Sequence, residues 1–227
     1  MKNNRFLHLW AFFLAACAML ETFVFIHAAA VAGQNCLMWY VLSFPWFIFC
    51  FEAGRIVGTR SPQRSGWVFP VLRTEAGIIP LLAVGYFVIV VWGMRSFPIG
   101  MIPLLIFIGV GVVAATRGRE VAGLASFECG GSPAQTKALL LYFYLGLLAT
   151  AWLYVLWLLP ALGLTIIILS AGAANAGCAL FLFILRDRIP ASLENRFYTF
   201  LYVHLALLVI LGWGALLAGR GTWGLFY

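Results

Sequence analysis

The sequence predicts an all-α, polytopic transmembrane helical bundle with about seven spans. Of its 227 residues, 64% are hydrophobic and 9% are charged, whereas soluble domains carry about a quarter charged residues. The apolar runs, such as 87–92 and 179–185, are continuous rather than alternating, which favours helices over a membrane β-barrel. Because no long polar stretch interrupts this pattern, residues 1–227 are predicted to form a single integral membrane domain.

Seven windows are long enough to cross roughly 30 Å of hydrocarbon, which takes about 20 helical residues. They cover residues 7–33, 36–58, 76–94, 98–116, 138–159, 162–185 and 197–219. Short turns are expected at 33–35, 96–98 and 160–163, where helix-breaking residues gather. Longer polar loops alternate with these turns, and one of them is predicted at 117–137.

The distribution of lysine and arginine predicts the orientation of the chain. Of the 14 Lys and Arg residues, all but Arg95 and Arg220 fall on one side of the seven predicted spans. The residues on that side are Lys2, Arg5, Arg55, Arg60, Arg64, Arg73, Arg117, Arg119, Lys137, Arg186, Arg188 and Arg196. Basic residues in short loops mark the cytoplasmic side. The N-terminus is therefore predicted in the cytoplasm and the C-terminus outside, in a bacterial cytoplasmic (inner) membrane.

The net charge of +7 follows from this topology and from attraction to anionic lipid headgroups. It does not require a nucleic-acid partner. The expected partners are the lipid bilayer and, at the basic loops, other membrane subunits or a cytoplasmic protein.

The beginning of the chain has features of a signal sequence. Met1–Arg5 precedes an apolar run, and Leu14–Cys17 is similar to a lipoprotein-processing box. A lipoprotein turns polar after that cysteine, whereas here apolar residues continue. The first span, including residues 1–16, is therefore predicted to be retained.

Glu21 is the acid that the predicted topology places deepest in a span. It lies 14 residues after the start of the first window, or roughly 21 Å at 1.5 Å per residue, which is beyond the midplane. An ionised carboxylate there is costly unless it is paired or hydrated. A carboxyl that takes up a proton at this depth is what proton coupling requires. The alternative is a protonated Glu21 that only hydrogen-bonds a neighbouring helix.

Four further residues are candidate functional residues. Glu52 and Arg55 are three apart, a helical pairing distance, and the simpler interpretation is an ion pair near the cytoplasmic end of the second span. Asn175, within a run of small residues, and His204 are expected to form interhelical hydrogen bonds. The depths of His27 and His204 do not match, which argues against a bis-histidine haem within one chain.

The sequence predicts no catalytic, cofactor or metal site. The five cysteines include no CxxC pair, and no two histidines share a helix face at ligand spacing. Nor does a hydrolase triad or a phosphate-binding loop occur.

The expected function is therefore a membrane-embedded transport component, with proton coupling through Glu21 as the functional hypothesis. It would be a small permease or the membrane subunit of a multi-component complex. One alternative is a structural or assembly subunit with no substrate of its own. A second is a lipid-modifying enzyme that uses Glu52, Arg55, Arg73 and Glu75 at the cytoplasmic face.

Overall fold

The computed structural model describes residues 4–33, 36–60, 101–128, 133–180 and 194–221. These residues form six α-helices and one π-helical segment, with no strand among them. The elements are α1 (Asn4–Gly33), α2 (Cys36–Arg60), α4 (Met101–Glu128), α5 (Pro133–Leu153), the π-helix η1 (Tyr154–Leu158), α6 (Leu159–Leu180) and α7 (Glu194–Gly221). The predicted all-helical class is confirmed for this part of the chain, while the predicted third span, 76–94, lies outside the described residues.

Three described helical segments are long and apolar enough to cross a membrane. They are Leu7–Ile26, Val41–Arg60 and Ala134–Leu162, and the shorter segments Ile166–Cys178 and Tyr202–Trp213 are also apolar. Large apolar side chains face outward from these helices: Phe49, Trp157 and Ile210 are each about two-thirds exposed or more, at 66%, 72% and 65%. Such an exterior suits a hydrocarbon solvent rather than water.

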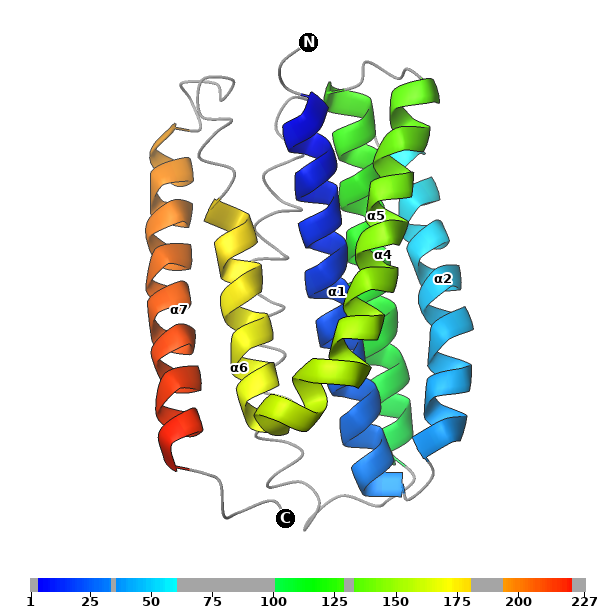
Figure 1. Cartoon of the computed structure of the whole chain (residues 1–227). Helices are drawn as coiled ribbons and strands as arrows, with labels where there is room; N and C mark the ends of the chain where they lie inside the picture. Colours follow the sequence, from blue (N-terminus) through cyan, green and yellow to red (C-terminus); the bar gives the residue numbers. More distant parts are fainter. Residues whose placement is uncertain (1–3, 34–35, 61–100, 129–132, 181–193, 222–227) are drawn as a thin grey trace.

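Helix α1 is the centre of the bundle (Figure 1). It contacts α2, α4, α5 and α6, whereas α7 packs on α6 at one side. Consequently 72% of its membrane-length window is buried, against 28% for the window of α2. A polar side chain that points from α1 into the bundle is thereby surrounded by protein rather than lipid.

Helices α2 and α4 approach each other closely because glycine lies on both sides of the contact. A Cβ atom added at Gly54 would overlap the backbone of Ala115, and one added at Gly118 would overlap the carbonyl of Phe51. Small residues let transmembrane helices pack backbone to backbone. This contact fixes α4 beside α2 at the level of its charged residues.

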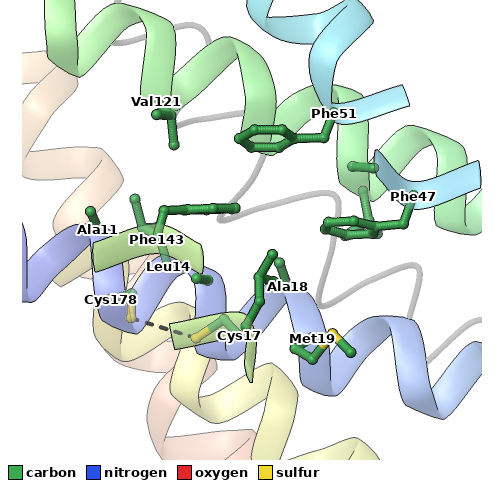
Figure 2. Packing of buried hydrophobic residues seen from close by; sticks show 14 of the residues in the cluster. Ala11, Leu14, Cys17, Ala18, Met19, Phe47, Phe51, Val121, Phe143 and Cys178 are labelled. Atoms are coloured by element: carbon green, nitrogen blue, oxygen red, sulfur yellow. Dashed lines mark hydrogen bonds between the residues drawn. The ribbon is translucent and has the colours of Figure 1, made fainter. Parts of the chain in front are cut away.

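Aromatic rings pack between several helices of the bundle, and those of Phe47, Phe51 and Phe143 are shown in Figure 2. Phe51 of α2 stacks on Phe143 of α5 with ring centroids 4.7 Å apart. Phe23 of α1 stacks on Tyr154 of η1 at 4.6 Å. Trp46 donates its indole N–H to the backbone oxygen of Phe107, 2.8 Å away, joining α2 to α4.

Two predicted boundaries are wrong. The segment 160–163, expected to be a turn, is helical: α5 passes through η1 directly into α6, and the ribbon changes direction at this place (Figure 1). A π-helical segment lets the chain bend without leaving the helix. The segment 117–137 was predicted as a loop, but α4 continues to Glu128 and α5 already begins at Pro133.

Helices α1, α5 and α7 run in one direction through the bundle, and α2, α4 and α6 run in the other (Figure 1). The start of α1, the ends of α2 and α4, and the starts of α5 and α7 all lie at one end of the bundle (Figure 1). Arg5, Arg60, Lys137 and Arg196 lie within a few residues of four of these ends. Helix α4 has no basic residue in its last turn, and Arg220 lies near the opposite end of the bundle, where α7 ends.

Candidate functional site

Glu21 lies in the interior of the bundle, on the face of α1 that meets α6. Its side chain is buried, with the residue 2% exposed. The side-chain amide of Asn175, on α6, donates a hydrogen bond of 2.7 Å to Glu21 Oε1. The predicted interhelical hydrogen bond of Asn175 is therefore present, and its acceptor is the acid singled out by the sequence.

Arg117 of α4 joins the same group of side chains and is completely buried. Its guanidinium donates a hydrogen bond of 2.8 Å to Asn175 Oδ1, and the same nitrogen lies 3.7 Å from Glu21 Oε2. The other terminal nitrogen donates to Glu120 Oε2 at 3.3 Å. Three helices thus bring together Glu21, Asn175, Arg117 and Glu120, which we call the buried polar cluster.

The prediction that Arg117 and Glu120 belong to a cytoplasmic loop is wrong. Both residues lie within helix α4 and are buried. Their burial is tolerated because each contacts an oppositely charged side chain, which offsets part of the free-energy cost of removing a charge from water. Because apolar content alone does not show such partners, the predicted fourth span ends at residue 116. The detectable signals were the spacing of the pair, at i and i+3, and the apolar residues that continue beyond it, such as Val121 and Leu124.

The cluster combines two carboxyl groups with one guanidinium. A guanidinium stays charged in any protein environment, so the carboxyl groups determine the total charge. Arg117 lies closer to Glu120, at 3.3 Å, than to Glu21, at 3.7 Å. The compensation of negative charge by positive charge is therefore unequal at the two acids.

Two further buried polar side chains lie on α1 and α7. The hydroxyl of Thr22, beside Glu21 in the sequence, donates to the backbone oxygen of Ala18 at 2.7 Å. His204 is buried in α7 at 2% exposure, and α7 packs against α6. The structure describes the backbone of α1 at His27 but not its side chain.

Glu52 and Arg55 form the ion pair that their spacing predicts, at 2.7 Å. Tyr144 of α5 adds a hydrogen bond of 3.3 Å to Glu52 Oε1. The two side chains are 36% and 33% exposed, which sets this pair apart from the completely buried Arg117. Arg73 and Glu75, the other residues assigned to a lipid-modifying enzyme, lie outside the described residues.

The donor set of the buried polar cluster suits protons better than metal ions. The described residues hold no group of three or more His, Cys, Asp or Glu side chains arranged for a metal. Each carboxyl group of the cluster could instead bind and release a proton. No model of a known protein family, no curated protein and no solved structure matches this chain.

Proposed function

We propose that this protein is a membrane-embedded transport component in which Glu21 takes up and releases a proton inside the bundle. The observation that carries the proposal is the buried polar cluster, with two carboxyl groups against one guanidinium. If both acids are ionised, these three groups carry one net negative charge. If one acid holds a proton, they are neutral.

The neutral state is favoured by the low dielectric of the interior. Leaving a net charge there costs several kcal/mol even after relaxation. Glu21 is the better site for the proton, since Arg117 is nearer to Glu120. Loss of that proton would draw Arg117 toward Glu21 and would disturb Asn175, which contacts both. Protonation at α1 would in this way be linked to the position of α4 and α6.

The proposed topology has seven spans, a cytoplasmic N-terminus and an external C-terminus, in a bacterial inner membrane. Its support is that Arg5, Arg60, Lys137 and Arg196 lie near helix ends that share one end of the bundle, against Arg220 near the other end. Arg117 is buried in α4 and no longer counts as a loop residue. The remaining Lys and Arg residues are still distributed unequally between the two sides of the proposed topology. An alkaline phosphatase fused after Tyr227 should be active in the periplasm, whereas one inserted at 60–64 should be inactive. Activity of the second fusion would contradict this orientation.

Glu21→Gln tests the proton site. Glutamine preserves the size of the side chain and an acceptor for Asn175, but it cannot titrate. In infrared difference spectra taken across roughly pH 5 to 9, a range wide enough for a perturbed carboxyl, the native protein should show a carboxyl band that Glu21→Gln removes. Glu52→Gln is the matched control, since it removes an acid outside the cluster and should leave that band unchanged.

Two results would count against the proposal. A spectrum without a titrating carboxyl would make the cluster a purely structural contact, as expected for an assembly subunit. A band that survives Glu21→Gln but disappears in Glu120→Gln would move the proton to the other acid. Retention of helical circular dichroism in each variant shows that the comparison is made between folded proteins.

A further inference from the structure

Two thiols face each other across the interface between α1 and α6. The sulfur atoms of Cys17 and Cys178 lie 3.6 Å apart and share a hydrogen bond, shown as a dashed line in Figure 2. Both residues are buried, at 3% and 6% exposure, and both are reduced. They are 161 residues apart in the sequence, so only the tertiary structure brings them together.

This thiol pair lies beside the buried polar cluster. Cys17 precedes Glu21 by four residues on α1, and Cys178 follows Asn175 by three residues on α6. Residues three or four apart lie on one face of a helix. The thiol pair and the Asn175–Glu21 hydrogen bond are therefore neighbouring contacts, about one turn apart, between the same two helices.

We propose that Cys17 and Cys178 form a reversible disulfide whose electron acceptor is a small apolar quinone. The sulfur atoms must approach by about 1.5 Å to reach the disulfide bond length near 2.05 Å. Each thiol loses one proton and one electron, and the S–S bond forms between the two sulfur atoms. The quinone takes up the two electrons and two protons and becomes a hydroquinone.

The surroundings of the thiols select an apolar acceptor. Cys17 lies within the membrane-length window of α1, Leu7–Ile26, and both cysteines belong to the same apolar cluster as Leu14 and Met19. Oxidised glutathione, a charged and water-soluble disulfide, would have to lose its hydration shell to reach these thiols, which is costly in hydrocarbon. A quinone without charge partitions into the bilayer and avoids this cost.

The disulfide would hold α1 against α6 next to Glu21. This consequence rests on the proposed function, because it matters only if proton exchange at Glu21 requires the two helices to move. The oxidised protein is then expected to lose the titrating carboxyl signal of Glu21, and a reductant is expected to restore it. In Cys178→Ser, the same quinone treatment should leave that signal unchanged.

The experiment uses the reduced full chain in lipid nanodiscs, treated with tetramethylbenzoquinone. Every ring position of this quinone is substituted, so it is expected to oxidise thiols rather than to remain attached to them. Mass spectrometry should show the loss of two hydrogens and, after proteolysis, one cross-linked peptide pair containing Cys17 and Cys178. Cys17→Ser and Cys178→Ser should each abolish that pair, while Cys50→Ser, which alters a buried cysteine of α2, should not.

Each other outcome would overturn a defined part of the proposal. Absence of the cross-linked pair in the native chain, or a pair with another cysteine, would overturn the redox pair. Equal oxidation by oxidised glutathione would overturn the apolar acceptor. A disulfide that forms but leaves the Glu21 signal unchanged would overturn the locking effect. Absence of a Glu21 signal in the reduced protein would overturn the proposed function alone, since the disulfide is measured by mass.

Discussion

Replacing Arg117 by leucine tests whether the buried polar cluster is held together by charge. The side chain is completely buried and lies within 2.8 Å of Asn175 and 3.3 Å of Glu120. Removing one partner of a buried ionic contact costs about 3–5 kcal/mol, because the remaining charge is left uncompensated. If the two contacts were only hydrogen bonds within a membrane, their loss would lower the free energy of unfolding by about 1.2 kcal/mol in total. The larger loss is expected for Arg117→Leu.

The measurement is reversible unfolding in mixed detergent micelles, followed by circular dichroism. Arg119→Leu is the matched control: it makes the same substitution on the same helix, but Arg119 is exposed, so the change should be within about 0.5 kcal/mol. Adding Glu120→Gln to Arg117→Leu should recover part of the loss, since an uncompensated carboxylate is then removed. The expected coupling between the two sites is about 0.5–3 kcal/mol. Equal stability of Arg117→Leu and Arg119→Leu would refute the charge argument.

Three smaller effects follow from the packing, and the same unfolding assay measures them. Gly118→Ala should destabilise the protein by about 1–3 kcal/mol, as overpacking does, because the added methyl meets the backbone of α2. At Gly212, where a Cβ would meet nothing within 4 Å, alanine should cost nothing, and an equal loss at both positions would contradict the close approach. Trp46→Phe should cost about 0.6–1.7 kcal/mol, because it removes the indole hydrogen bond to Phe107, and an unchanged stability would show that this bond contributes nothing. Glu52→Gln should cost at most about 1 kcal/mol, as for exposed ion pairs, and a loss comparable to that of Arg117→Leu would mean that its surroundings exclude water.

The location of the cluster explains why the sequence predicted only part of it. Glu21 and Asn175 interrupt long apolar runs, so both were identifiable as polar groups inside spans. Arg117 and Glu120 follow an apolar run that is already long enough to cross the membrane. The usual interpretation of charges at that position is a loop, and it was wrong because α4 continues for another three turns.

The limits of the spans show the same difference. The predicted first, second and seventh windows, 7–33, 36–58 and 197–219, agree within a few residues with α1, α2 and α7. Charged residues or helix-breaking residues mark these ends directly. The connection between α5 and α6 has Pro160 and Gly163, which predicted a turn, but the backbone bends through η1 and remains helical. Lipid favours this solution, since a helix satisfies its own backbone hydrogen bonds.

The sequence by itself determined that this protein is helical and suited to a membrane, because apolar content and span length depend only on composition and order. It also identified Glu21 as a polar group with a high cost of burial. Only the tertiary structure decided which residues offset that cost. Asn175 and Arg117 come from helices far apart in the chain, and so do Cys17 and Cys178. Contacts between helices depend on how their faces are turned toward one another, and that rotation is set by packing across the whole bundle rather than by any local segment.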